Sequence, residues 1–293
     1  MKCSGTGVAA AVLSAAAILG TTLPSPARAA RSYDNCTGFI DFLPATISAQ
    51  GTWCLRHDLS TALAGGNAII IATNNVTVDC NDFKLGGLAA GAGTTTTGIF
   101  ANARQNAVIR NCNIRGFQTG IGLLGGGGHR VEHNSLDGNT YTGIRVESAA
   151  STIRDNRVID TGGSTANPGE AIGISTSDTV DVLGNTVNGV AGVPDSGNAS
   201  AYGIVTFENA EGSVAGNRVR GLVSTGAGTI FGIYNSDSGR LILRDNDVQG
   251  SGVAASIGVH CTSDQATARD NVVTGFATGI SSCLSDGDTV NTN

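Results

Sequence analysis

The chain has 293 residues, of which 40% are hydrophobic, 14% charged and 4% aromatic, and 43 are glycine. This length and hydrophobic content allow a large buried core, and so much glycine is more typical of short strands and turns than of helices. The formal net charge is −6. A net negative charge repels polyanions, so nucleic acid is not expected as a partner.

The first 30 residues predict a secretory signal peptide. They begin with the basic Lys2, continue with an apolar run from Val8 to Leu19, and end in small residues around Arg28. The apolar run is too short to cross a bilayer, so no membrane span is expected after cleavage. Cleavage would leave 15 basic and 23 acidic residues, a net charge of −8. We expect a secreted or periplasmic protein.

Residues 31–66 lack the repeat that follows them and predict an N-terminal cap over the first open end of a repeat array. Six cysteines remain after signal cleavage, an even number that permits full pairing in an oxidising compartment. We expect Cys36 to pair with Cys54 within the cap. Trp53 and Phe42 are expected to plug the core there, although Trp53 could instead stack on a sugar.

From residue 67 onward the chain repeats a strand that opens with a Gly-Ile or Gly-Val pair. The residue after each glycine is expected to point inward and to share that face with the residue before the glycine and the residue two positions further on. The resulting inward column would be Ile99, Ile121, Ile144, Ile174, Ile204, Ile233, Val259 and Ile280.

A second column lies at a turn, where an asparagine is followed two residues later by Leu or Val. Its members are Asn134, Asn156, Asn185, Asn217, Asn246 and Asn271. Stacked amide side chains can hydrogen-bond to one another along such a ladder, so a structural role accounts for this column. Extra residues collect after the turn, in segments 161–171, 189–201 and 222–229.

These two columns resemble those of the right-handed parallel β-helix repeat proteins of the pectin-lyase-like superfamily. The resemblance implies an all-β fold for residues 67–293, a right-handed parallel β-helix of about eight coils. Members of the superfamily include polysaccharide lyases and polygalacturonases, which act through acids, bases or Ca²⁺ in grooves. The polygalacturonase strings Asn-Thr-Asp, Asp-Asp, Gly-His-Gly and Arg-Ile-Lys do not occur in this chain, so no specific enzyme family is matched.

The repeat register also predicts two disulfides between neighbouring coils. Cys80 and Cys112 each stand at an asparagine-column position, and Cys261 and Cys283 occupy equivalent places in successive coils. Stacked positions lie about 4.8 Å apart, a Cα separation that a disulfide accepts. We therefore expect the pairs Cys80–Cys112 and Cys261–Cys283.

Each of the later coils places an acid shortly after the Gly-Ile strand. These acids are Glu147, Asp178, Glu208, Asp237, Asp264 and Asp286. Stacked in register they would form a carboxylate ladder, which could serve glycoside chemistry or bind a hard cation such as calcium. Asp178, Glu208 and Asp237 are the candidate calcium ligands. The competing interpretation, which we weight about two to one, is that these acids are ordinary turn residues.

A third column faces outward directly after each Gly-Ile pair and includes Arg145, Tyr234 and His260. Arginine can neutralise a carboxylate, tyrosine can stack on a sugar, and histidine can act as a base. The candidate catalytic residues are Asp178, Glu208, Asp237 and His260. The candidate substrate-binding residues are Arg145, Glu147 and Tyr234. A solvated His260 and a Tyr234 that covers apolar surface are the alternative.

Two weaker signals do not change this interpretation. His129 and His133 are four residues apart, a spacing of about 13 Å on a strand, which is too far to share a metal. Arg154, Arg244 and Arg269 recur before Asp-Asn and are expected to balance neighbouring acids, although a glycan-binding strip is conceivable.

We therefore expect a monomeric β-helix that binds an extracellular polysaccharide, with modification of that polysaccharide by a lyase or hydrolase reaction as a further hypothesis. The alternative is a non-catalytic structural, adhesion or envelope protein. Copper handling is a weaker third possibility, because the chain after signal cleavage has no methionine. The enzyme hypothesis requires that Asp178, Glu208, Asp237 and His260 meet in one cleft.

Overall fold

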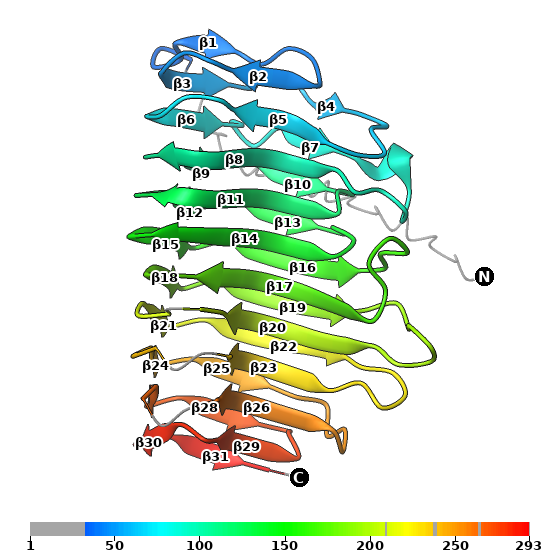
Figure 1. The fold of residues 1–293 in the computed structure, drawn as a ribbon, viewed down its shortest axis with the longest axis vertical. Helices are drawn as coiled ribbons and strands as arrows, with labels where there is room; N and C mark the ends of the chain where they lie inside the picture. Colours follow the sequence, from blue (N-terminus) through cyan, green and yellow to red (C-terminus); the bar gives the residue numbers. More distant parts are fainter. Residues whose placement is uncertain (1–32, 209, 237–238, 263–264, 293) are drawn as a thin grey trace, which may run out of the picture. The chain divides into compact units, whose positions relative to one another are not determined.

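The computed structural model describes residues 33–208, 210–236, 239–262 and 265–292. The expected signal peptide, residues 1–30, lies outside this range. The described chain winds into a right-handed parallel β-helix of about nine turns (Figure 1). Three parallel sheets, which we call A, B and C, run along the stack. No helix among the described residues is long and apolar enough to cross a membrane.

Sheet B contains the Gly-Ile strands and faces the viewer in Figure 1. Its ten strands are β2 (Ala45–Ile47), β5 (Asn67–Ile71), β8 (Thr97–Gln105), β11 (Thr119–Gly127), β14 (Thr142–Ala149), β17 (Glu170–Ser177), β20 (Ser200–Thr206), β23 (Ile230–Asn235), β26 (Ser256–Cys261) and β29 (Thr278–Ser281). Eight of them are the strands expected from the repeat. β2 and β5 extend the stack toward the N-terminus beyond these eight strands.

Sheet A follows sheet B along each turn. Its eleven strands are β1 (Gly38–Phe39), β3 (Gly51–Cys54), β6 (Val76–Asp79), β9 (Val108–Arg110), β12 (Arg130–Glu132), β15 (Ser151–Arg154), β18 (Val180–Leu183), β21 (Ser213–Ala215), β24 (Ile242–Arg244), β27 (Thr267–Arg269) and β30 (Leu284–Asp286).

Sheet C completes each turn after the asparagine column. Its ten strands are β4 (Leu59–Ser60), β7 (Lys84–Gly86), β10 (Asn113–Arg115), β13 (Ser135–Asp137), β16 (Arg157–Gly162), β19 (Thr186–Ala191), β22 (Arg218–Val223), β25 (Asp247–Gln249), β28 (Val272–Thr274) and β31 (Thr289–Asn291). A 3-10 helix, η1 (Leu88–Ala90), follows β7.

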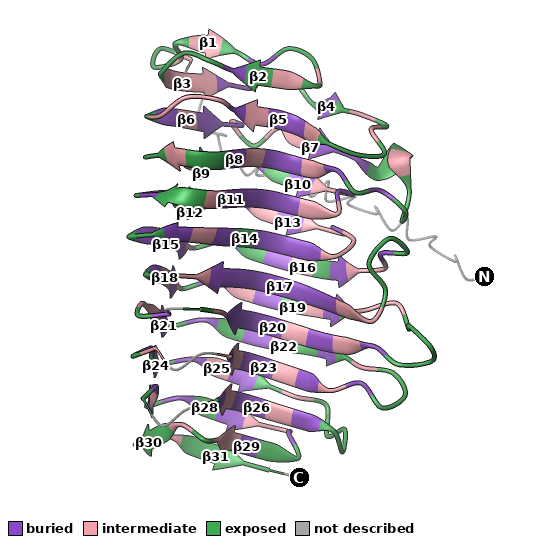
Figure 2. Ribbon diagram, viewed as in Figure 1, coloured by how far each residue is buried: buried purple, intermediate pink, exposed green. Residues whose placement is uncertain are grey.

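The core is the apolar interior between the three sheets (Figure 2). The predicted inward column is confirmed, because Ile99, Ile121, Ile144 and their successors pair in register from strand to strand. Seven of its eight members are 0% exposed, and Ile280 in the last turn is half-buried. Aliphatic side chains stacked in this way remove a continuous apolar surface from water, at roughly 25 cal/mol per Å².

The asparagine ladder is also confirmed. The side-chain oxygen of Asn156 accepts the backbone N–H of Asn134 at 3.0 Å and its side-chain N–H at 2.9 Å. The same pair of bonds recurs down to Asn271, which donates to Asp288 at 2.8 Å. The residue before each ladder position has a left-handed backbone, as at His133 with φ 56°. The ladder therefore satisfies the polar groups of a tight turn between sheets A and C.

All three predicted disulfides are present. The Cα atoms of Cys36 and Cys54 are 5.8 Å apart, and those of Cys80 and Cys112 are 4.7 Å apart. The third bridge joins Cys261 to Cys283 with a Cα separation of 5.1 Å. The N–H of Cys112 donates to Asn134 at 3.0 Å, which confirms that this cysteine occupies a ladder position.

Residues 33–66, expected to be a cap, join the same three sheets. Strand β2 pairs with β5, β3 with β6, and β4 with β7. Trp53 is half-buried against the core, but Phe42 is 73% exposed, so the expectation that Phe42 plugs the core is wrong. The chain bends outward between β1 and β2 at this residue, and buried Ile40, Ile47 and Leu55 fill the core in its place.

Candidate functional site

The predicted outward column lies on sheet B as expected. Arg145 pairs in register with Ser175, Ser175 with Val205, Val205 with Tyr234, and Tyr234 with His260. These five residues come from successive strands β14, β17, β20, β23 and β26. The repeat therefore sets Tyr234 and His260 side by side on the outer surface.

A second outward column was not expected. The residue before each glycine was predicted to point inward, yet Tyr202 and Phe231 at this position lie outside the buried core cluster. The reason is that the glycine itself faces the core: a Cβ added at Gly203 would overlap the Val219 side chain and the Gly232 carbonyl oxygen. The inward-facing glycine shifts the alternation by one residue, so positions on both sides of the Gly-Ile pair face outward.

The two outward columns together form an aromatic cluster, which we define as Tyr202, Phe231, Tyr234 and His260. Tyr202 stacks on Phe231 with ring centroids 5.4 Å apart, and Phe231 stacks on Tyr234 at 4.7 Å. Tyr234 stacks on His260 at 5.4 Å. The four rings thus form one continuous, largely apolar surface over strands β20, β23 and β26.

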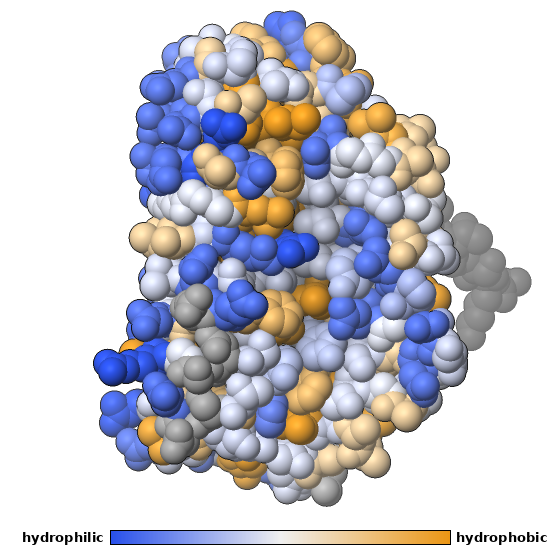
Figure 3. All heavy atoms as spheres, viewed as in Figure 1, coloured by the Kyte–Doolittle hydropathy of each residue, from blue (hydrophilic) through white to orange (hydrophobic). Residues whose placement is uncertain are grey.

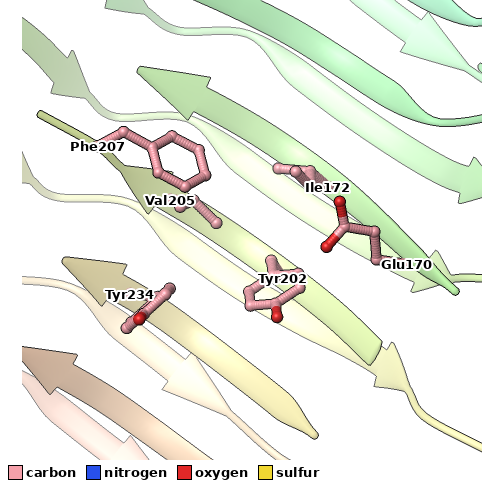
Figure 4. A pocket seen from close by; sticks show the side chains of 6 residues that line it. All are labelled: Glu170, Ile172, Tyr202, Val205, Phe207 and Tyr234. Carbon is pink, nitrogen blue, oxygen red and sulfur yellow. The ribbon is translucent and has the colours of Figure 1, made fainter. Parts of the chain in front are cut away.

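One end of the aromatic cluster borders a pocket, shown in Figure 4. Its lining combines apolar side chains with one carboxylate: Glu170, Ile172, Tyr202, Val205, Phe207 and Tyr234. The hydroxyl of Tyr141 donates a short hydrogen bond to the Glu170 carboxylate. We call this site the aromatic pocket. It places a carboxylate beside the ring of Tyr202, and Tyr234 lines the pocket farther from Glu170 (Figure 4).

A second pocket lies beside the aromatic pocket and shares Phe207 with it. It is lined by Arg145, Glu147, Ser177, Phe207 and Glu208, and we call it the acidic pocket. Arg145 Nε donates to Glu147 Oε1 at 2.6 Å. Hydrophobic and hydrophilic side chains alternate across the middle of this face (Figure 3). The predicted binding residues Arg145, Glu147 and Tyr234 therefore lie along two neighbouring pockets.

Tyr141, Tyr202 and His260 on this face have shifted pKa values. Burial, followed by the hydrogen bond to Glu170, raises the pKa of Tyr141 well above its usual range. Burial and the charge of Glu170 also raise the pKa of Tyr202. Burial lowers the pKa of His260, whose Nδ1 has no hydrogen-bond partner among the described residues. Near neutral pH both tyrosines are uncharged hydroxyl groups.

Two of the predicted carboxylates, Glu147 and Asp286, fall outside the expected ladder. Glu147 pairs with Ser177 and not with an acid, and Asp178 occupies a turn position with φ 63°. Asp286 lies on β30 of sheet A, where it pairs in register with Arg269. Glu147 follows its Gly-Ile pair more closely, and Asp286 less closely, than Asp178 and Glu208 follow theirs, which explains why these two acids are out of register. Asp237 and Asp264 lie outside the described residues.

The candidate catalytic residues are therefore only partly placed. The backbone N–H of Asp178 donates to the carbonyl of Glu208 at 3.0 Å, so these two residues are neighbours. Glu208 lines the acidic pocket, whereas His260 belongs to the aromatic cluster and lines neither pocket. No group of three or more His, Cys, Asp or Glu side chains among the described residues could hold a metal ion. A calcium site that includes Asp237 stays a prediction.

The two weaker sequence signals have structural explanations. His129 is buried and accepts the Ala107 N–H at 3.1 Å, whereas His133 is an exposed turn residue. Arg154 donates to Glu132 at 2.6 Å, and Arg269 donates to Asp286 at 3.2 Å. Those arginines balance acids on sheet A, as expected.

Comparison with known proteins identifies one family. The model described as the right handed beta helix region matches residues 56–210, which is 155 of the 293 residues. The match includes strands β14, β17 and β20 and every residue of the two pockets except Tyr234, and it begins within the segment expected to be the cap. No curated protein matches the chain, and no solved structure matches it.

Proposed function

Because the chain belongs to the right handed beta helix family, we propose that it binds a polysaccharide along the outer face of sheet B. The binding surface would run from Arg145 through the two pockets to His260. One observation carries the proposal: apolar rings and hydrogen-bonding carboxylates line two adjoining pockets on one face. Fold alone assigns no function, so the argument rests on these residues.

The chemistry of both pockets suits a sugar. The rings of Tyr202 and Tyr234 offer flat apolar surface to the C–H face of a pyranose, and the tyrosine hydroxyls are polar handles. Glu170 and Glu208 provide acceptors for sugar hydroxyl groups. Ligand sites typically combine mostly apolar walls with a few placed polar groups, as the aromatic pocket does.

The surroundings of this face agree with such a role. The long segments 161–171, 189–201 and 222–229 join sheet C to strands β17, β20 and β23, next to the aromatic pocket. Variable loops held beside a rigid sheet are common places for binding sites. The three disulfides favour an oxidising compartment, so we place the function in the extracellular space or the periplasm.

We propose binding as the primary function and leave modification as a secondary prediction. Glycoside hydrolysis needs two carboxyl groups with different roles. In the acidic pocket Glu147 is already ion-paired with Arg145 at 2.6 Å. Asp178, Glu208, Asp237 and His260 remain the candidates for any lyase or hydrolase reaction. The competing function is a structural or adhesion protein, in which the stacked rings and the Asn ladder only tie the coils together.

Glycan binding by Tyr234→Ala tests the proposal. We expect the wild-type protein to bind one or more polysaccharides on a glycan array, and Tyr234→Ala to bind the same glycans at least about tenfold more weakly. The matched control is Phe100→Ala, because Phe100 occupies the same outward column on β8 but lies away from both pockets. Thermal unfolding of both variants confirms that each is folded.

Two results would count against binding at this face. One is the absence of any glycan bound by the folded wild-type protein, which would favour the structural role. The other is an equal loss of affinity in Tyr234→Ala and Phe100→Ala. Incubation of any bound polysaccharide with the protein, with and without Ca²⁺, followed by detection of new chain ends, tests modification separately.

A further inference from the structure

The charge of the binding face restricts which polysaccharide it can hold. Three carboxylates line the two pockets, from Glu147, Glu170 and Glu208, against the single cation of Arg145. Arg145 is also the only Lys or Arg on the six strands β14, β17, β20, β23, β26 and β29. The face is therefore acidic, within a chain that is itself acidic.

Arg145 lines the acidic pocket and does not line the aromatic pocket. Its guanidinium is engaged by Glu147 at 2.6 Å within the acidic pocket. The aromatic pocket is lined by no Arg or Lys, and Glu170 is the one charged residue in its lining. A uronate or sulfated chain in the aromatic pocket would meet the like charge of Glu170, and no Arg or Lys lines that pocket to pair with it.

Glu170 is well placed for a cationic group. One of its oxygens accepts a hydrogen bond from the hydroxyl of Tyr141, which holds the carboxylate in place, and its second oxygen has no hydrogen-bond donor among the described residues. The rings of Tyr202 and Tyr234 line the same pocket. Aromatic faces next to a carboxylate attract ammonium groups, through the ring quadrupole and through a charge-assisted hydrogen bond.

We propose that the ligand is an amino-sugar polymer with protonated amines, and that one amine binds between Glu170 and the ring of Tyr202, while Tyr234 contacts the sugar farther along the pocket (Figure 4). The proposal rests on the proposed function and adds the substrate class. The neighbouring sugar residues would extend over Phe207 into the acidic pocket, where Glu208 can accept a further N–H. The raised pKa of Tyr202, to which the Glu170 charge contributes, agrees with a negative potential in this pocket.

Calorimetry with matched sugars tests the proposal. The probes are a glucosamine hexamer, the N-acetylglucosamine hexamer with the same backbone but no charge, a galacturonate hexamer, and the free polyamine spermidine. At about pH 5.5 the amines are protonated while ordinary carboxyl groups are ionised. We expect the glucosamine hexamer to bind at least about tenfold more tightly than each of the others, and to lose affinity as salt is added.

Glu170→Gln is the decisive variant because it keeps the side-chain shape and removes the charge. We expect it to weaken binding of the glucosamine hexamer about tenfold or more and to leave binding of the N-acetylated hexamer within about twofold. The control is Asp160→Asn, which removes an exposed acid on β16 of sheet C. That variant should bind like the wild type.

The outcomes separate this inference from the proposed function. Equal affinity for the charged and acetylated hexamers, or tighter binding of galacturonate, would overturn the amino-sugar assignment while polysaccharide binding stands. Spermidine binding as tight as that of the glucosamine hexamer would overturn the sugar part of the assignment. Failure of every sugar to bind the folded protein would overturn both.

Discussion

The rings of Tyr202 and Tyr234 stack with centroids 6.0 Å apart, although the two residues stand at different positions of the repeat. Tyr202 precedes the Gly-Ile pair of β20, and Tyr234 follows the Gly-Ile pair of β23. Gly203 faces the core, so its neighbour Tyr202 faces outward. Tyr202 therefore lies on the same outer face as Tyr234. The glycine column of sheet B is thus what assembles the aromatic pocket.

Gly203→Ala should therefore destabilise the protein strongly. The added methyl would overlap the Gly232 carbonyl oxygen and the Val219 side chain, so either the backbone or the core must move. We expect a loss of about 3 kcal/mol in the free energy of unfolding, the upper range for overpacking. Urea denaturation followed by circular dichroism measures it.

The control for this substitution is Gly93→Ala. The nearest atom to a Cβ at Gly93 would be Thr165 Oγ1 at 3.5 Å, an ordinary contact distance. We expect its stability to stay within about 0.5 kcal/mol of the wild type. Equal stability of Gly203→Ala and Gly93→Ala would show that the glycine column has no steric role.

Asn185→Ala tests the asparagine ladder. The Asn185 side chain accepts the backbone N–H of Asn156 at 3.0 Å and donates to Ile153 O at 2.9 Å, and all these groups are buried. Alanine leaves them without partners, so we expect a loss of about 3 kcal/mol in a denaturant titration. Asn188→Ala removes an exposed amide from β19, the strand that follows Asn185, and should change stability by less than about 0.5 kcal/mol. If Asn185→Ala and Asn188→Ala changed the free energy of unfolding equally, the ladder would make no special contribution to stability.

The periodic part of the fold was predictable from the sequence because the repeat exposes it directly. Stacked coils require the same residue type at the same place, so the isoleucine column, the Asn ladder and the paired cysteines were visible as alignments. Asp288 could have been added, since it stands two residues before Val290 as each ladder asparagine precedes an aliphatic residue. The coil at β2–β4 was missed because it lacks the Gly-Ile pair.

The candidate site was less predictable, for a local reason. If side chains alternated strictly between the two faces of each strand, Tyr202 and Phe231 would point into the core. They point outward because the glycine after each of them faces the core. Glu170 was missed because it is the first residue of β17, ahead of the Gly-Ile pair and directly after a long loop whose path the repeat does not determine. Arg145, Glu147 and Tyr234 were correctly placed on one face, because the outward column depends on register alone.

Acidic pH should weaken the fold through His129. Its Nδ1 accepts the Ala107 N–H at 3.1 Å, which requires the neutral ring, and burial lowers its pKa below the usual 6.5. The unfolded chain then binds the proton first, so the full contribution of His129 to stability is present above pH 6.5. That contribution is lost as the pH falls from 6.5 toward the lowered pKa of the folded state.

Thermal unfolding between pH 7.5 and about pH 5 measures this effect. We expect the melting temperature of the wild type to fall over that range and the slope to be reduced in His129→Gln. A smaller slope should remain, because the pKa of His260 is also lowered by burial and has the same sign. His133→Asn removes an exposed imidazole from a turn and serves as the control. An unchanged slope in His129→Gln would contradict the assigned role of this ring.

The most direct test of the account is a crystal structure of the protein with a bound amino-sugar oligosaccharide. The account predicts ordered sugar on the outer face of sheet B, with an amine within hydrogen-bonding distance of Glu170 and a pyranose ring against Tyr202 or Tyr234. Sugar bound only on sheet A or sheet C, or no ordered sugar at saturating concentration, would contradict it.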